Sequence, residues 1–346
     1  MKRGIDRKYI PVACTICVAA LLYVAAGLSY NGFFEPQVFI NFLIDNAFLG
    51  IVAMGMTFVI LSGGIDLSVG SVVALTGVLT AFLVEKSQWH PLAVFPVALL
   101  CGSLLGFGMG CIIHFFKSPP FIVTLAGMIF ARGMANVISL ESIPIYHPFF
   151  ANMTSWGIPL GNGMILPSIV LIYLGVFGCA LYLAHYTKFG RNVYAIGGSE
   201  QSAQLMGVAV GRTKIAIYAL SGFLSALGGI VLTMYTSAGY GLAGEGLELD
   251  AIACVVIGGT LLSGGVGYLA GTFVGVLIMG IIQTFIIFKG TLSSWWTKIA
   301  IGILLFIFIV LQRALLHFSQ RSKRTVVSAG SKKKSGERPE AIYKAE

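Results

Sequence analysis

Residues 61–71 read LSGGIDLSVGS, and residues 262–272 read LSGGVGYLAGT. Each of these two stretches follows one apolar segment and precedes another, so each places paired glycines and polar groups near membrane depth. Backbone groups inside a bilayer must satisfy their own hydrogen bonds. A non-helical break therefore survives there only where protein buries it or where it lines a water-filled path. Broken helices at corresponding places in two halves of a chain are typical of a transport pathway.

The similarity between the two stretches extends outward on both sides. Aligning them places Ile51–Leu61 over Ile252–Leu262, and Val73 over Val274. The repeat is parallel if the spans are counted as below, and it is inverted if that count is wrong by one. Either arrangement predicts two related halves around a pathway.

The composition indicates an all-α polytopic membrane protein with about ten transmembrane helices and two pseudo-repeated broken-helix regions. Hydrophobic residues make up 57% of the chain, charged residues 10%, and the mean hydropathy is +0.91, whereas soluble domains have about 25% charged residues. Apolar runs of about 20 residues predict spanning helices. These runs lie at residues 9–29, 42–62, 67–84, 92–113, 121–140, 164–186, 214–235, 248–262, 267–288 and 297–316. The eighth run is short for a full crossing, which suits a re-entrant or tilted segment. We expect one transmembrane domain over residues 1–316 and a basic, disordered tail over residues 317–346.

The distribution of basic residues predicts the orientation of the chain. Most of the 22 Lys and Arg residues flank the spans on one side, and this side is the cytoplasmic one by the positive-inside rule. Both termini are therefore expected in the cytoplasm. The net charge of +9 reflects the same rule. Because the basic residues are scattered over loop ends, the sequence does not indicate a nucleic-acid partner.

The longest inner loop, residues 187–214, predicts a short amphipathic helix. Ser199 can cap this helix, and Leu205, Met206 and Val208 give it an apolar face. One interpretation is a segment that lies on the membrane surface. The other is a docking element for a soluble partner.

The chain has no motif that would let it supply energy or catalyse a reaction. It contains no GxxxxGK[ST] phosphate loop, so either a partner hydrolyses ATP or an ion gradient drives transport. The letters LSGG also occur in the signature sequence of ABC ATPase domains, but there they belong to a soluble nucleotide-binding domain. Here both copies lie between apolar spans, so this match is coincidental. No HExxH or Ser–His pair indicates an enzyme, and the six cysteines lack metal-site spacing. We expect no metal and no cofactor on this chain.

Three long stretches together resemble the permease subunit of sugar ABC importers, the family of ribose, xylose and galactose permeases. They are FLGIVAMGMTFVILSGGIDLSVGSVVALTGV, YAIGGSEQSAQLMGV and ELDAIACVVIGGTLLSGGVGYLAGTFVGVLI. Residues 142–148, SIPIYHP, and residues 291–313, TLSSWWTKIAIGILLFIFIVLQR, look closest to one permease of the galactofuranose importer.

This resemblance implies a multi-pass subunit of the bacterial inner membrane that imports a galactofuranose-like monosaccharide. It implies a second permease chain in a heterodimer, ABC ATPase subunits on the cytoplasmic side that bind ATP and Mg, and a periplasmic sugar-binding protein. It also implies that the docking helix runs from Gly198 to Gly207. The residues expected to couple to the ATPase are Gly198, Ser199, Glu200, Gln201, Ala203, Leu205, Met206 and Gly207.

Polar residues within the apolar runs are the candidates for the transport pathway. Asp66 fits three roles: an N-cap for the third span, a carboxylate that meets sugar hydroxyls, or a proton relay. Arg132 lies mid-span and needs a partner there, for which Asp66 and Asp45 are the candidates. Amide side chains suit a neutral polyhydroxylated solute, although they also join helices. The candidate pathway residues are Asp45, Asn46, Gly63, Gly64, Asp66, Arg132, Asn136, Gly264, Gly265 and Gln283.

The main alternative is an ion-coupled secondary sugar transporter that works without an ATPase. Asp66 and Arg132 suit such a carrier, whereas the docking-like loop favours the ATP-driven importer.

Overall fold

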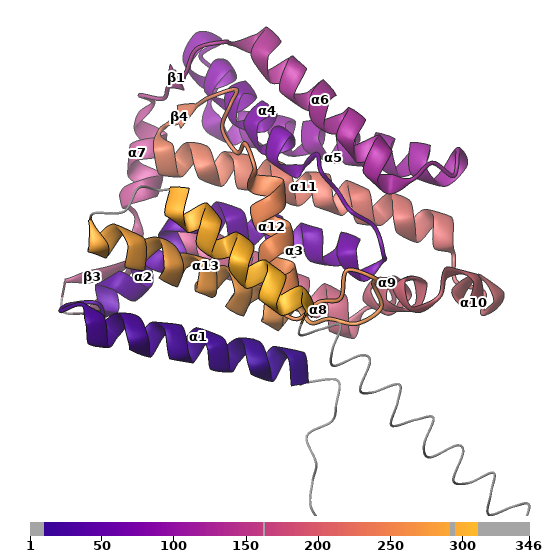
Figure 1. Cartoon of the computed structure of the whole chain (residues 1–346). Helices are drawn as coiled ribbons and strands as arrows, with labels where there is room; N and C mark the ends of the chain where they lie inside the picture. Colours follow the sequence, from indigo (N-terminus) through magenta and orange to yellow (C-terminus); the bar gives the residue numbers. More distant parts are fainter. Residues whose placement is uncertain (1–9, 162, 291–294, 311–346) are drawn as a thin grey trace, which may run out of the picture.

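The computed structural model describes residues 10–161, 163–290 and 295–310. The whole of the expected tail and the end of the tenth run lie outside these residues. Most of the described chain is helical (Figure 1). The helices are α1 (Ile10–Ser29), α2 (Pro36–Asp45), α3 (Ala47–Leu61), α4 (Val69–Ala81), η2 (Phe82–Lys86, a π-helix), α5 (Pro91–Phe115), α6 (Pro120–Ile138), α7 (Pro148–Ser155), α8 (Ser168–Tyr186), α9 (Lys188–Gly198), α10 (Glu200–Leu205), α11 (Val210–Thr236), α12 (Leu247–Ile257) and α13 (Leu269–Lys289), followed by a helix over Trp295–Val310.

The expected polytopic all-α architecture is confirmed. Within the described residues, seven helices are long and apolar enough to cross a membrane, and the bent pair α2–α3 raises the number to eight. The eighth and tenth apolar runs form shorter helices, α12 and Trp295–Val310. Two of the ten expected spans therefore form helices that, within the described residues, are short for a full crossing.

The second apolar run, expected as one helix over residues 42–62, is bent at Asn46. Helices α2 and α3 meet there at 56°. The Asn46 backbone leaves the helical region, with φ −111° and ψ 9°. Its side-chain Nδ2 donates to the carbonyl oxygen of Phe42 at 3.1 Å. The side-chain bond holds the residue to the preceding turn and supports the bend.

Helix α11 is the central element of the bundle, and it packs against α3, α4 and α5. Glycines allow the closest of these contacts. A Cβ atom on Gly106 would lie 2.1 Å from the carbonyl oxygen of Tyr218, and one on Gly222 would lie 2.2 Å from that of Gly102. Small residues that let helix backbones approach are typical of helix packing in membranes.

The molecule has two distinct ends (Figure 1). Helices α9 and α10 lie at one end, which we call the α9 end, together with the start of α1. The opposite α7 end carries α7 and two small antiparallel sheets. Strand β1 (Ile143–Pro144) pairs there with β4 (Ala238–Gly239), and β2 (Gly157–Gly161) pairs with β3 (Met164–Pro167).

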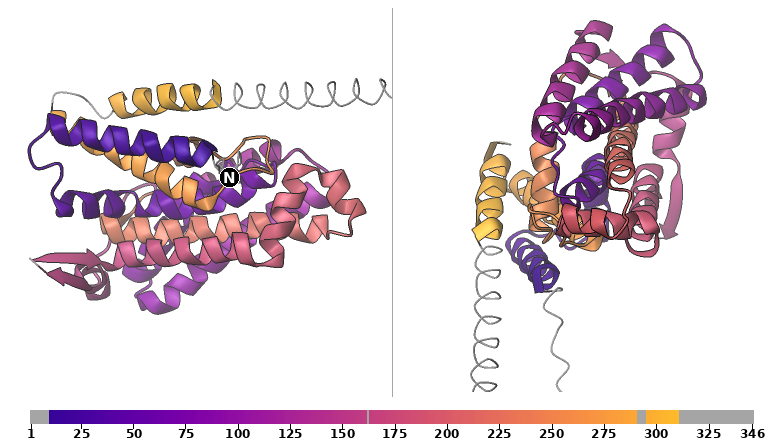
Figure 2. Two further views of the ribbon diagram at one scale, coloured as in Figure 1. Left: turned by 90° about the horizontal axis from the view of Figure 1, so that it is seen from below. Right: turned by 90° about the vertical axis from the view of Figure 1, so that its right-hand side faces the viewer.

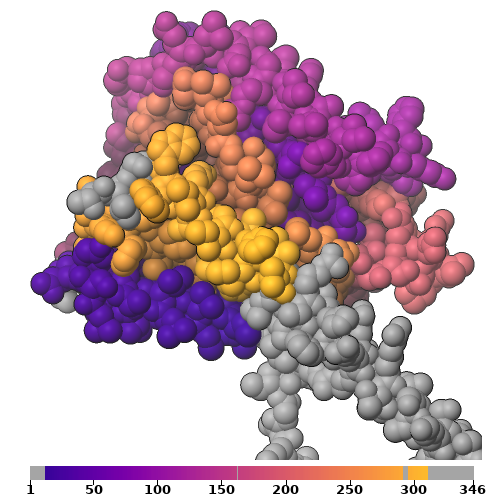
Figure 3. Space-filling view, viewed as in Figure 1, coloured from indigo at the N-terminus to yellow at the C-terminus, as the bar shows by residue number. Residues whose placement is uncertain are grey.

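Helix α1 and the Trp295–Val310 helix lie together on one side of the bundle. Figure 2 shows both in the view from the α9 end, and Figure 3 shows the indigo surface of α1 along one edge of the molecule. Both helices pack beside α13, where Leu22, Ile282 and Trp296 line one apolar cavity. They therefore form a peripheral layer outside the buried helices α3 and α12.

Candidate functional site

Helices α3 and α12 end in the same local structure. After α3, Gly63 has φ +84°, and the Gly64 amide donates to the carbonyl oxygen of Val59 at 3.0 Å. After α12, Gly259 has φ +91°, and the Thr260 amide donates to that of Val255 at 3.2 Å. Both ends are Schellman motifs, in which glycine is favoured because φ is positive.

The structure corrects the alignment of the two breaks. Helix α12 ends at Ile257, before the second LSGG stretch, so the counterpart of Gly63 is Gly259 and not Gly264. Gly264 and Gly265 lie further along the same loop, also with positive φ, +81° and +76°. Hydrophobicity alone continued the helix to Leu262, but the glycine pair at 258–259 ends it first.

The two breaks contact each other directly. The Gly265 amide donates to the carbonyl oxygen of Leu61 at 2.9 Å. A Cβ atom on Gly264 would lie 2.7 Å from the backbone nitrogen of Gly63. The first residues of α3 and α12 lie near each other at the α7 end (Figure 1), and both helices end at this contact, so the two repeats run parallel.

Helix α9 packs onto the same place. A Cβ atom on Gly197 would lie 1.8 Å from the carbonyl oxygen of Leu61 and 2.4 Å from the Gly265 amide nitrogen. We call Leu61, Gly63, Gly197, Gly264 and Gly265 the glycine junction. It brings three of the four candidate pathway glycines, Gly63, Gly264 and Gly265, together with the loop that was expected to couple to a partner.

Tyr194 forms a second link between α9 and the α12–α13 loop. Its hydroxyl donates to the carbonyl oxygen of Gly267 at 2.9 Å. Burial raises the pKa of Tyr194 to about 12, and the nearby Tyr268 contributes to the shift. Sequence reasoning missed Tyr194 and Gly197, although both lie in the quoted YAIGGSEQ stretch.

Asp66 is fully buried and carries three hydrogen bonds. Its Oδ1 accepts from the amide of Ser68 at 2.9 Å and from the hydroxyl of Ser68 at 2.6 Å. Its Oδ2 accepts from the hydroxyl of Ser221 at 2.7 Å. The carboxylate thus organises the start of α4, close to the expected capping role, and ties it to α11.

The expected pairing of Arg132 with Asp66 or Asp45 is wrong. Nη1 of Arg132 donates to the carbonyl oxygens of Gly241 and Ala243, at 2.7 and 2.8 Å. Asp45 instead accepts from the hydroxyl of Tyr235 at 3.0 Å. The loop between β4 and α12 approaches α6, and its carbonyl groups satisfy the guanidinium. The charges of Glu248 and Glu245 also stabilise it.

The three amide candidates lie in different places. Asn46 is buried at the α2–α3 bend, and Asn136 is half-buried, with its Oδ1 2.6 Å from the position of a Cβ atom on Gly241. Gln283 is half-buried on α13 and, among the described residues, makes no hydrogen bond to the other candidates. Asn136 therefore lies beside the Arg132-bound loop, whereas Gln283 lies apart from it.

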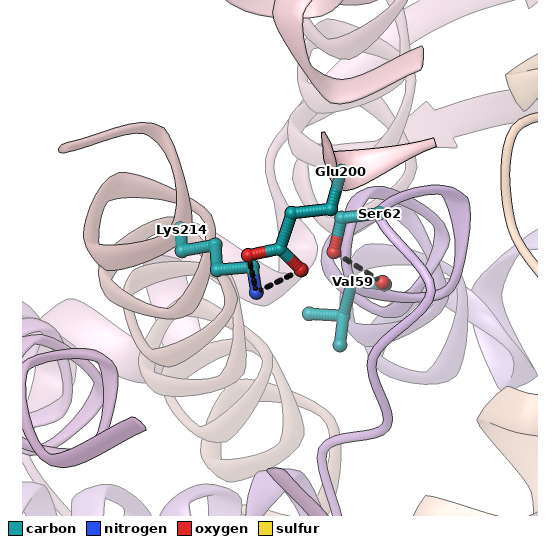
Figure 4. A network of polar contacts seen from close by, with 4 residues as sticks. All are labelled: Val59, Ser62, Glu200 and Lys214. Atoms are coloured by element: carbon teal, nitrogen blue, oxygen red, sulfur yellow. Dashed lines mark hydrogen bonds and ion pairs between the residues drawn. The ribbon is translucent and has the colours of Figure 1, made fainter. Parts of the chain in front are cut away.

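The expected coupling helix is α10. Its N-cap Ser199 accepts from the Ser202 amide at 3.2 Å, and Gly207, with φ +80°, follows its end. Glu200 pairs with Nζ of Lys214 on α11 at 2.7 Å, as Figure 4 shows. Leu205 and Met206 are 89% and 72% exposed, so their apolar side chains project outward at the α9 end. Gly198 and Gln201 are exposed, and Ala203 is buried.

Comparison with known proteins finds a matching family model and several similar permeases. Residues 38–309 match the family model described as branched-chain amino acid transport system / permease component. The chain is 56% identical to the inner membrane ABC transporter permease protein YjfF of Escherichia coli (strain K12) over 311 residues, which cover 89% of this chain and 93% of that protein.

Two other relatives have names that include a sugar. The fructose import permease protein FruG of Bifidobacterium longum (strain NCC 2705) is 36% identical over 91% of this chain and 94% of its own length. The ribose import permease protein RbsC of Bacillus subtilis (strain 168) is 39% identical over 85% of this chain and 90% of its own length. No solved structure matches the chain.

Proposed function

We propose that this chain, which belongs to the family of permease components of branched-chain amino acid-type transport systems, is the membrane subunit of an ATP-driven monosaccharide importer. The observation that carries the proposal is the similarity, over most of the chain, to permeases named for the import of fructose and ribose. The family description names amino acids, but the names of these two relatives favour a sugar as the substrate. Among sugars, the resemblance of residues 142–148 and 291–313 favours galactofuranose.

The exposed apolar tip of α10 is the proposed docking point for the ATPase. Leu205 and Met206 are large apolar side chains left in solvent at the end of a six-residue helix, and such exposed apolar groups mark interaction sites when they are contiguous. Nucleotide and Mg would bind to the ATPase. The α9 end would then be cytoplasmic, with both termini on that side, in the bacterial inner membrane.

The glycine junction offers a route from the ATPase to the breaks. Helix α9 continues directly into α10 through Ser199, and at its other face it touches Leu61 and Gly265. A displacement of α10 would therefore move both break loops together. In this mechanism, ATP-driven motion of the ATPase opens and closes the pathway, and the permease itself carries out no chemistry.

Affinity for the sugar would come from a periplasmic binding protein that docks at the α7 end. A second, different permease chain would complete the pathway. Tight binding within the permease would slow release, so we expect only weak binding along the pathway.

The geometry argues against the ion-coupled alternative. Asp66, the candidate proton carrier, accepts three hydrogen bonds from Ser68 and Ser221, and these bonds give its carboxylate a structural role at the start of α4. Arg132 is held by backbone carbonyls. Both groups therefore have structural partners, which favours a packing role for each over a relay.

The first test is to purify the tagged chain gently from its native membranes and identify co-purifying proteins by mass spectrometry. An ABC ATPase and a second permease chain are the expected companions. A chain that purifies alone from several mild detergents would overturn the proposal. In parallel, sugar uptake should survive collapse of the ion gradients while ATP remains; loss of uptake under that condition would favour the ion-coupled carrier.

A further inference from the structure

A cavity of about 490 Å³ lies at the α7 end, apart from the glycine junction and next to the loop that Arg132 holds. Helices α4 and α11, the first residues of α3 and α12, and the loop between β4 and α12 enclose it. Tyr240 and Glu245 in this loop are exposed, so the cavity opens toward the α7 end. Its volume falls in the range of about 300–1,000 Å³ that is usual for small-molecule sites.

Most of the cavity wall is apolar, but a set of oxygen-bearing side chains interrupts it. They are Ser142, Thr233, Thr236, Tyr240, Glu245 and Asp250. Phe48 adds an aromatic side chain to the lining. An apolar wall with a few convergent polar groups is the usual composition of a ligand site.

The polar groups of the wall are mainly acceptors. The hydroxyl of Thr233 donates to the carbonyl oxygen of Ile230 at 2.7 Å, and that of Thr236 donates to the carbonyl oxygen of Leu232 at 2.9 Å. Their protons are thus engaged by the backbone, while their oxygens retain lone pairs. Ionised Glu245 and Asp250 can only accept. A ligand that donates several hydrogen bonds therefore matches this wall.

The charge around the cavity is negative. The described lining contains Glu245 and Asp250 and no Lys or Arg. Lys298 pairs with Asp250 at 2.5 Å, and Arg132 binds the loop carbonyls and interacts with Glu245 and Glu248. Three carboxylates thus face two cations, and the remaining negative charge disfavours an anionic ligand.

We infer that this cavity is a low-affinity subsite for a neutral monosaccharide, at which sugar hydroxyls donate to Thr233, Thr236 and Glu245, and that it discriminates against sugar acids and sugar phosphates. The inference rests on the proposed function, because a sugar must reach the α7 end. It adds a selective step within the permease itself, beyond any selection by a binding protein.

A labelling experiment tests the subsite without requiring transport. A Thr236→Cys variant of the chain, in membranes with its companion proteins, is labelled with a membrane-impermeant maleimide, and the unsubstituted chain supplies the background of the six native cysteines. Galactose at tens of millimolar should slow the labelling at least three-fold, and galacturonate at the same concentration should not. A Ser155→Cys variant, at an exposed position on α7, is the control and should be labelled at one rate in both sugars. Equal labelling of Thr236→Cys with and without galactose, or equal protection by galacturonate, would overturn the inference.

Transport by the reconstituted complex supplies the second readout. Thr233→Val keeps the side-chain shape and removes the hydroxyl, and it should lower kcat/KM for uptake about five-fold, as expected for one hydrogen bond. Thr80→Val is the matched control, because Thr80 is a buried helical threonine with the same kind of backbone bond and does not line the cavity. Equal uptake by both variants contradicts the inference. Absence of ATP-driven sugar uptake by the unsubstituted complex would instead contradict the proposed function.

Discussion

The amide of Gly265 donates a 2.9 Å hydrogen bond to the carbonyl oxygen of Leu61. The bond joins the loop after α12 to the last residue of α3, two segments some two hundred positions apart in the chain. Because Gly197 of α9 packs against the same two groups, three segments meet at one point. The following predictions concern this junction and the surfaces connected to it.

Replacing Gly197 with alanine should uncouple α9 from the breaks. The new Cβ atom would lie 1.8 Å from the carbonyl oxygen of Leu61, and because the obstacle is backbone, α9 or α3 must shift. Overpacking of this kind costs about 1–3 kcal/mol, and uptake should fall at least ten-fold. Gly198→Ala is the control, since its Cβ atom would meet nothing within 4 Å. Uptake assays at matched membrane abundance make the comparison, and equal uptake by the two variants would show that the junction is not required.

Replacing Tyr194 with phenylalanine should remove the link from α9 to Gly267. The loss of one hydrogen bond costs about 1 kcal/mol, and we expect ATP hydrolysis to continue while uptake falls several-fold. Tyr186→Phe, at an exposed position, should have no effect. The ratio of sugar transported to ATP hydrolysed is the measurement, and an unchanged ratio in Tyr194→Phe would refute the link.

The same tyrosine should not make transport sensitive to pH in the ordinary range. Its pKa is raised from 10.0 to about 12, so the protonated form is favoured in the folded protein. The protonated Tyr194 hydroxyl therefore stabilises the folded protein fully below about pH 10, and this contribution is lost as the pH rises through about 12. The difference in uptake between the wild type and Tyr194→Phe should therefore stay constant from about pH 6 to about pH 9, and a difference that disappears within that interval would contradict the assignment.

Replacing Leu205 with glutamate should weaken attachment of the ATPase. The side chain is 89% exposed, so the change should not affect folding, but a charge would replace an apolar group at the proposed contact. Loss of one apolar anchor at an interface typically costs about 2 kcal/mol or more. Gln204→Glu adds the same charge at the neighbouring exposed position of α10 and serves as the control. The amount of ATPase that co-purifies is measured, and equal recovery from both variants would place the contact elsewhere.

Replacing Arg132 with alanine should destabilise the loop between β4 and α12. Two charge-assisted hydrogen bonds, to Gly241 and Ala243, would be lost, each worth about 1.5–3 kcal/mol. Thermal unfolding in detergent should shift to lower temperature by several degrees. The adjacent Gly133→Ala, whose Cβ atom would have open space, should leave the transition unchanged or raise it. A similar transition temperature in both variants would mean that the loop does not depend on Arg132.

Several local features could be predicted from the sequence because they depend on neighbouring residues. Apolar runs of sufficient length predicted the spanning helices, and Ser199 followed by a short polar segment predicted the capped helix α10. The glycine pairs correctly marked both breaks as non-helical. The register of the second break was wrong, because two adjacent glycine pairs, at 258–259 and 264–265, both suit a helix end and hydropathy does not choose between them.

What the sequence by itself determined is the class of the molecule and the presence of two breaks, since bilayer thickness and backbone hydrogen bonding act on each segment separately. The partners of the polar groups were decided only by the tertiary structure. Asp66 meets Ser221 and Arg132 meets the Gly241 carbonyl group, although the sequence offered Asp66 and Asp45 as the candidate partners of Arg132. The physical reason is that a buried polar group takes the donor or acceptor that helix packing brings within about 3 Å, and no local pattern specifies which distant segment that is.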